Sequence, residues 1–322
     1  MKLEIKMKKL LKVLLVSCLF LLASRSYGQQ QVMFTQYMFN QLALNPAYAG
    51  IHRGISMSFL ARNQWVGFDG APKTQTFSIH SPLKYRSIAL GALIIRDQIG
   101  ITDQLGAQFS YSYRISFLNK TKLSFGLQAG FNQYQADFTS NPNNDPNLAG
   151  QNVNDFAPNI GTGVMWHSDQ FYVGLSIPQL FNHTVGDDLE VPIDPSTGEA
   201  IDPDSKMIRH YFMTAGYVFQ LNPDLKLKPN ILFKWVKGAP FQIDLNANFL
   251  IKELIWLGVS YRSLDSFDAL LQLQLTPQFQ IGYSYDFLTT SDLGRVNRGS
   301  HEFMINYVFH LKSDKIVTPR YF

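Results

Sequence analysis

The feature that most constrains this sequence is the alternation of apolar and polar residues in runs of about ten. In the clearest run the order is Phe241, Gln242, Ile243, Asp244, Leu245, Asn246, Ala247, Asn248, Phe249. Similar runs occupy residues 105–117 and 279–287. Successive side chains of a β-strand point to opposite faces, so each run predicts a strand with one apolar face. About ten residues is also the length of a tilted strand that crosses a bilayer.

Composition narrows the classes of protein that fit this pattern. The chain has 322 residues, of which 14% are aromatic and 16% charged, against about 25% charged in an ordinary soluble domain. Its 25 Phe and 15 Tyr exclude a disordered chain. No apolar stretch of about 18 residues follows the leader, which excludes a helical membrane protein. A soluble sandwich would present a polar face rich in Lys and Glu, but here that face is mostly Gln, Asn, Ser, Thr and Gly. The pattern favours a membrane β-barrel with a hydrated lumen.

Fourteen strand-like runs are expected, and twelve or sixteen remain alternatives. The runs are 51–61, 73–81, 87–96, 104–117, 122–135, 157–167, 170–176, 207–219, 225–236, 241–251, 254–263, 268–275, 278–288 and 301–311. Every second connection is very short, whereas the others include polar stretches at 62–72, 136–156, 177–206 and 289–300. Short periplasmic turns that alternate with longer external loops are typical of outer-membrane barrels. An even number of strands places both termini on the periplasmic side.

Residues 1–28 predict a cleaved signal peptide. They hold six basic residues against one acidic residue, then an apolar run from Val13 to Ala23, then small residues at Ser26 and Gly28. A lipoprotein signal at Cys18 is the alternative, disfavoured because the apolar core continues beyond it. Cys18 is the only cysteine, so the mature chain has no thiol or disulfide chemistry. Beyond the leader, 22 basic residues face 23 acidic ones, which argues against a nucleic-acid partner.

The sequence predicts neither an enzyme nor a cofactor or metal site. His301-Glu302 opens like a zincin motif, but the second His is replaced by Ile305. A nucleophile elbow fails because Pro178 stands where it needs Gly. A Ser/His pair across two strands, as in an outer-membrane hydrolase, remains an alternative class.

Two groups of polar residues are candidate sites. Asp187, Asp188 and Glu190 lie in an acidic stretch that is expected to be an external loop, either merely solvated or a docking surface for an exported partner. The polar faces of the strands carry a few charges that are expected in the lumen, namely Arg114, Lys234, Asp244, Arg262 and Asp286. Cross-lumen pairs, such as Arg262 or Lys234 with Asp244, would relieve the cost of burying them. A conduction path is the alternative.

Residues 29–50 precede the first strand and do not alternate. Phe34, Tyr37, Met38, Phe39 and Leu42 recur at near-helical spacing. This spacing predicts a short helix that plugs the periplasmic mouth of the barrel. The alternative is a periplasmic segment that contacts a partner.

The same segment carries a family resemblance. The runs Phe34–Asn40 (FTQYMFN) and Asn45–Gly50 (NPAYAG) resemble the opening signature of the PorP/SprF family, outer-membrane proteins of the Bacteroidetes type IX secretion and gliding-motility machinery. The resemblance continues through Arg62–Gly67, Gly70–Thr74, Asp97–Gly100, Gly216-Tyr217, Leu227–Pro229, Gly258–Arg262, Tyr283–Asp286, Ser300–Glu302 and Pro319–Phe322. Thr35 stands where Ser is expected, and Tyr321 where Phe is often seen. Asn45-Pro46-Ala47 is also weakly similar to the N-terminal hatch of FadL-like fourteen-stranded barrels.

The resemblance implies a function that composition cannot show. Such proteins are needed for export or surface attachment of adhesins, and are thought to engage the adhesin's C-terminal domain outside and periplasmic ring or lipoprotein components inside. The implied plug or partner-binding residues are Phe34, Gln36, Tyr37, Phe39, Asn45, Pro46 and Tyr48. We therefore expect an all-β protein, a transmembrane antiparallel β-barrel of about 14 strands in outer-membrane lipid. Its parts are a signal peptide (1–28), a plug (29–50), a barrel (51–312) and a periplasmic tail (313–322). The alternative function is a porin or FadL-like channel for small or hydrophobic solutes.

Overall fold

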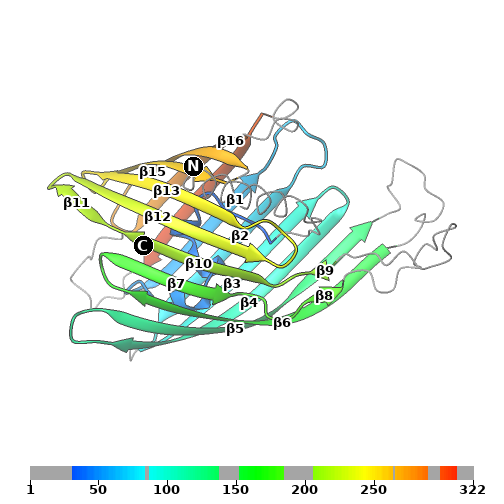
Figure 1. Cartoon of the computed structure of the whole chain (residues 1–322), viewed down its shortest axis with the longest axis horizontal. Coiled ribbons are helices and arrows are strands. Elements are labelled where there is room, and N and C mark those ends of the chain that lie inside the picture. The colour runs from blue at the N-terminus through cyan, green and yellow to red at the C-terminus, as the bar shows by residue number, and fades with distance from the viewer. Residues whose placement is uncertain are drawn as a thin grey trace, which may run out of the picture.

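The chain forms a closed antiparallel β-barrel of 14 strands (Figure 1). The computed structural model describes residues 31–83, 87–137, 152–184, 206–263, 265–288 and 298–309. Each of the fourteen alternating runs corresponds to one strand of the barrel, so the predicted fold class and strand number are confirmed. The signal peptide, residues 187–190 and the C-terminal tail lie outside the described residues.

The barrel strands have the following bounds: β1 Ile55–Asn63, β2 Lys73–Pro82, β3 Ile88–Ile99, β4 Thr102–Ser116, β5 Lys122–Asp137, β6 Asn152–His167, β7 Phe171–Ile177, β10 His210–Tyr217, β12 Leu225–Val236, β13 Gln242–Ile251, β14 Ile255–Arg262, β15 Ser266–Gln274, β16 Phe279–Leu288 and β17 Ser300–Phe309. A short strand, β11 (Phe219–Asn222), continues β10 along β12. Between β7 and β10, β8 (His183–Thr184) and β9 (Lys206–Met207) form a separate two-stranded sheet.

Closure of the barrel joins the first strand to the last. β1 pairs with β17 from Ile55↔Phe309 to Asn63↔His301, and β10 pairs with both β7 and β12. Every barrel strand therefore has a neighbour on both sides. Hydrocarbon offers no hydrogen bonds to backbone groups, and a closed sheet is one of the few structures that satisfies them internally.

The two ends of the barrel differ in the length of their connections. Short connections such as 168–170 and 252–254 gather at one end, here called the turn end. The opposite end, the loop end, carries 64–72, 178–209 and 289–299. In Figure 1, β11 lies toward the turn end and β8 and β9 lie toward the loop end. By the usual asymmetry of outer-membrane barrels, the turn end is periplasmic and the loop end external.

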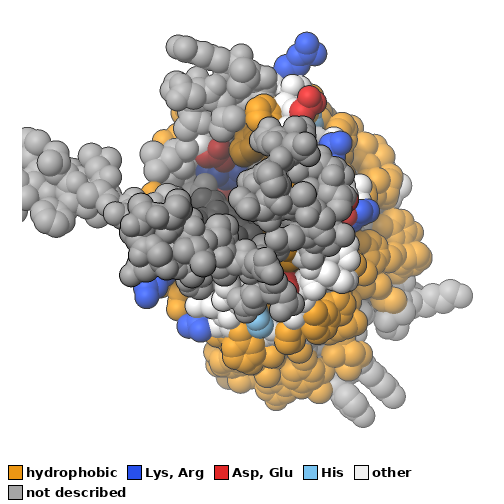
Figure 2. Space-filling view, turned by 90° about the vertical axis from the view of Figure 1, so that its right-hand side faces the viewer, with side chains coloured by type: hydrophobic (Ala, Val, Ile, Leu, Met, Phe, Trp, Pro, Cys, Tyr) orange, Lys and Arg blue, Asp and Glu red, His pale blue; other side chains and the backbone are white. Residues whose placement is uncertain are grey.

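Along each strand, side chains alternate between the outer wall and the lumen, as predicted. On β13, Phe249 is 38% exposed on the outer wall, while its neighbour Asn248 is 1% exposed and faces the lumen. Hydrophobic side chains cover much of the flank of the molecule (Figure 2). In the part of the chain described, no helix has the length and apolar character needed to cross a membrane.

The N-terminal segment lies inside the barrel; we call residues 31–50 the plug. It forms three short 3₁₀ helices, η1 (Tyr37–Phe39), η2 (Gln41–Ala43) and η3 (Pro46–Tyr48), so the predicted single helix is wrong. One reason is local, because Pro46 keeps Asn45 in an extended conformation, with φ −142° and ψ 114°. Around the plug, inward-facing Leu60, Leu93, Phe212 and Met304 form an apolar core.

The path of the plug also differs from the expectation. At its beginning, the backbone N–H of Gln31 donates to Nε2 of His210 (3.1 Å), the first residue of β10 at the loop end. At its end, the N–H of Gly50 donates to Nδ1 of His80 (3.1 Å), near the turn end of β2. The segment therefore runs the length of the lumen. It is neither a stopper at the periplasmic mouth alone nor a periplasmic arm.

Candidate functional site: the plugged lumen

The loop-end half of the plug is held by a buried carboxylate on β17. The two oxygens of Glu302 accept the backbone N–H groups of Thr35 (2.9 Å) and Gln36 (2.8 Å). All three residues are at most 1% exposed. Hydrogen bonds to an ionised group are stronger than neutral ones, so this contact fixes the position of the plug backbone.

Arg62 on β1 ties that carboxylate to a second one. Its guanidinium lies 3.1 Å from Glu302 and 2.6 Å from Asp286 on β16. The Thr35 hydroxyl accepts from Arg62 (2.8 Å) and donates to Asp286 (2.9 Å). Three strands and the plug therefore share one buried network, in which each charge has an opposite charge beside it.

A second arginine contacts the plug from β14. The Nε of Arg262 lies 2.9 Å from Asp244, and its Nη2 donates to the carbonyl of Phe34 (3.3 Å). The predicted ion pair of Arg262 with Asp244 is therefore present, but it joins directly paired residues of neighbouring strands and does not cross the lumen. Lys234 on β12 is also buried, but Asp244 takes Arg262 as its ion-pair partner.

The turn-end half of the plug rests on glycines. A Cβ on Gly126 of β5 would lie 2.1 Å from the backbone nitrogen of Ala47, and one on Gly163 of β6 would lie 2.1 Å from Oδ1 of Asn45. Only a residue without a side chain allows the plug so close to these strands. The contact is therefore one of shape rather than charge.

Polar contacts complete this half. Asn45 accepts the N–H of Ala47 (2.9 Å), which caps η3 ahead of Pro46. Its Nδ2 donates to the carbonyls of Val164 (3.2 Å) and Leu175 (3.4 Å). On β4, Arg114 donates to the carbonyl of Ala49 (3.3 Å). Of the predicted lumen charges, Arg114 therefore serves this half of the plug.

Aromatic residues fill the middle of the lumen. Phe39 meets Trp256 edge-on with ring centroids 5.7 Å apart, and the Lys228 ammonium lies 4.7 Å from the Phe39 ring. Tyr37 is 1% exposed, and its hydroxyl has no hydrogen-bond partner among the described residues. Tyr37 therefore acts as a neutral filler.

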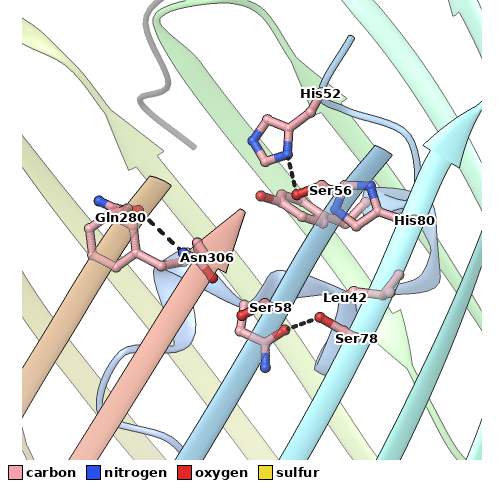
Figure 3. Close-up of a pocket in the computed structure, with 11 residues that line it drawn as sticks. Leu42, His52, Ser56, Ser58, Ser78, His80, Gln280 and Asn306 are labelled. Carbon is pink, nitrogen blue, oxygen red and sulfur yellow. Dashed lines mark hydrogen bonds between the residues drawn. The ribbon is translucent and has the colours of Figure 1, made fainter. Parts of the chain in front are cut away.

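Near the turn end, Tyr48 packs against two histidines. The rings of His52 and His80 stack with centroids 5.5 Å apart, and Tyr48 meets His80 edge-on at 5.4 Å. Figure 3 shows the pocket beside them, where Ser56 bonds to His52 and Ser78 to the plug. Its volume is about 20 Å³, enough for about one water. The pocket has no room for a solute.

The structure brings together seven of the predicted site residues in the plug and five lumen charges along the wall around it. The alternation of residues along the strands predicted that Asp244, Asp286 and Arg262 face the lumen. Two residues of the network were not predicted as lumen residues, namely Arg62 and Glu302. No group of three or more His, Cys, Asp or Glu suited to a metal ion occurs within the described ranges. The predicted loop residues Asp187, Asp188 and Glu190 lie outside those ranges.

These features define a class: a 14-stranded outer-membrane β-barrel whose lumen is filled by its own N-terminal segment. The chain belongs to the family described as type IX secretion system membrane protein PorP/SprF, whose sequence profile matches residues 26–307. The predicted resemblance and the outer-membrane location are thereby confirmed.

Solved structures show the same fold at low identity. The chain is similar to the Ralstonia pickettii toluene transporter TbuX, with a TM-score of 0.51 and 10% identity over 89% of this chain and 97% of that one. The CymD monoaromatic hydrocarbon channel gives a TM-score of 0.47 and 13% identity over 88% and 95% of the two chains. A Pseudomonas aeruginosa FadL homologue gives 0.44 and 13% over 83% and 93%. No curated protein matches the sequence.

Proposed function

We propose that this protein is a non-enzymatic attachment component of type IX secretion and gliding, which captures the C-terminal domain of an exported adhesin at the loop end. The observation that carries the proposal is the family match over residues 26–307. On the turn end, periplasmic ring or lipoprotein components of the same machinery are the proposed partners.

The filled lumen supports a docking role over conduction. A channel for solutes would need the plug to leave its hydrogen bonds to Glu302, Asp286 and Arg262 and its close backbone packing on Gly126. Hydrogen bonds to charged groups contribute about 1.5–3 kcal/mol each, so spontaneous opening of the lumen is rare. Purified protein in planar bilayers is expected to show no steady ion conductance. Steady conductance or uptake of a hydrophobic solute would favour the alternative channel.

The direct test is co-purification with the C-terminal domain of an adhesin that the same type IX machinery exports. Capture is expected with the intact chain, and deletion of residues 187–204 is expected to weaken it while the barrel still migrates in its folded, heat-modifiable form on detergent gels. The control is a domain of the same adhesin from which the C-terminal region has been removed. Equal capture of both domains would contradict the proposal.

A labelling experiment tests which end of the plug the partner can reach. Gln31 lines a pocket at the loop end together with His210 and Ile208. The mature chain is expected to contain no cysteine, so Gln31→Cys introduces a unique thiol. In intact cells it is expected to react with a membrane-impermeant maleimide, and bound adhesin domain is expected to slow that reaction. Ala49→Cys, buried at the other end of the plug, is the control.

A further inference from the structure

The outer wall of the barrel is hollowed over β12, β13 and β14. A cavity of about 740 Å³ opens there on the lipid-facing side, lined by Ala215, Pro229, Ile231, Leu245, Ala247 and Val259 among others. On the neighbouring strand β10, Tyr217 and, beyond it, Phe219 also line it. The side chains that line the hollow from outside carry no charge.

The register of the strands explains the hollow. Pro229, Ala247, Val259 and Ala269 are directly paired in sequence across β12 to β15, so four small side chains form one continuous outward row. The rows on either side are large. Toward the loop end they are Ile231, Leu245, Tyr261 and Phe267, and toward the turn end Leu227, Phe249, Leu257 and Leu271. The row of small residues is therefore the floor of a furrow, whose loop-end ridge lines the hollow and whose turn-end ridge lies beyond that lining.

The dimensions of the furrow limit what fits in it. The ridges stand four residues apart along each strand, about 13 Å between Cα atoms, and their own side chains occupy much of that width. A helix, about 10–12 Å wide with its side chains, does not reach the floor. The three strand spacings from β12 to β15 give a length of about 14 Å, close to half of a hydrocarbon core of about 30 Å.

We propose that the furrow binds one acyl chain of a phospholipid from the turn-end leaflet. The furrow is continuous with the lipid-facing wall, so hydrocarbon reaches it without leaving the bilayer. At the turn-end side the hollow is lined by Phe171, the first residue of β7, and by Phe219, so this margin of the hollow lies near that interface. A phospholipid headgroup remains at the interface while one chain lies along the floor. The proposal is independent of the adhesin-binding function.

Native mass spectrometry of the purified protein with added phosphatidylethanolamine tests the proposal. The intact protein is expected to retain one lipid at collision energies that remove all others. Ala247→Phe places a large ring on the floor and is expected to abolish that adduct. Ala129→Phe is the matched control, since Ala129 also faces lipid but is paired with Phe109, which is 68% exposed and interrupts any furrow there.

Heat-modifiable migration shows whether each variant is folded, and Ala247→Leu replaces Ala247→Phe if the larger ring prevents folding. Equal retention of the lipid by the intact protein and the folded furrow variant would overturn the proposal. A dimer that is present in the intact protein and lost in the furrow variant would also overturn it, because the occupant would then be a second copy of this chain. Loss of the adduct in the furrow variant alone supports it.

Discussion

Residues 34–36 of the plug are held mainly by charged side chains, whereas residues 45–49 are held mainly by close packing, with Arg114 as a charged contact at Ala49. Glu302, Arg62 and Arg262 contact the first group through hydrogen bonds to the backbone and the Thr35 side chain. Gly126 and Gly163 accept the second group because they have no side chain. The two halves differ in whether a binding partner could replace their contacts with the wall. A hydrogen bond to a charged side chain can be exchanged for one from a partner, whereas close backbone packing cannot be exchanged without leaving a void.

The loop-end and turn-end halves of the plug therefore have different roles. The charged half begins beside the loop end, which is the end proposed to bind an exported partner, and its polar contacts can be remodelled. The packed half lies toward the turn end and leads directly into β1, so it anchors the plug to the wall. Four substitutions test this division, from the largest expected effect to the smallest.

Arg62→Met is expected to have the largest effect. It leaves Asp286 and Glu302 buried without the cation that now lies 2.6 Å and 3.1 Å from them. Removing one partner of a buried ion pair costs about 3–5 kcal/mol, so the free energy of unfolding in lipid vesicles, measured by denaturant titration, should fall by that amount. The triple variant Arg62→Met, Asp286→Asn, Glu302→Gln removes the uncompensated charge and should recover part of the loss. A single variant as stable as the intact protein would show that charge does not hold this half.

Gly126→Ala tests the packed half. The new Cβ would meet the Ala47 backbone nitrogen at 2.1 Å, and backbone does not move aside as a flexible side chain does. Overpacking of this kind costs about 1–3 kcal/mol. Gly106→Ala on β4 is the control, because its Cβ would meet only the amide oxygen of Asn132, at 2.6 Å. If both variants lose the same stability, the plug does not depend on the glycine at 126.

The barrel could be predicted from the sequence because the period of two is local. Each strand sorts its own residues into lipid-facing and lumen-facing sets, whichever strands it pairs with. Leu245, Asn246 and Ala247 therefore face as expected before any register is known. The alternating lengths of the connections are also read directly from the sequence, and they predict which end of the barrel is periplasmic.

The site could be predicted only in part, because its contacts are long-range. Arg62 and Glu302 are 240 positions apart, and the first predicted run ends at residue 61, so Arg62 is predicted to lie in a loop. Near-helical spacing predicted one helix for the plug, but the segment forms three 3₁₀ turns, and Asn45 is extended before Pro46. Nothing local in the sequence marks Gly126 as the place where another backbone touches the wall.

Asn45→Ala is expected to have an intermediate effect on the packed half. It removes the cap of η3 and two amide donations to wall carbonyls. Loss of an N-cap costs about 0.5–2 kcal/mol, and the free energy of unfolding should fall within this range. Asn45→Ser keeps an acceptor for the Ala47 N–H but loses the Nδ2 donations to the wall carbonyls. Its free energy of unfolding should therefore lie between those of Asn45→Ala and the intact protein. If Asn45→Ser is as unstable as Asn45→Ala, the bonds to the wall matter more than the cap.

Tyr37→Phe is expected to have the smallest effect, because Tyr37 belongs to neither means of attachment. Its ring fills the lumen between the two halves, and its buried hydroxyl has no hydrogen-bond partner among the described residues. Removing a buried hydroxyl that makes no hydrogen bond relieves its desolvation cost, so the variant should match or exceed the intact protein within about 1 kcal/mol. An ordinary phenol titrates near pH 10, so this result should not change between pH 6 and pH 8. A loss well above 1 kcal/mol would mean that an ordered water or a residue outside the described ranges bonds the hydroxyl, and that the middle of the plug is a third point of attachment.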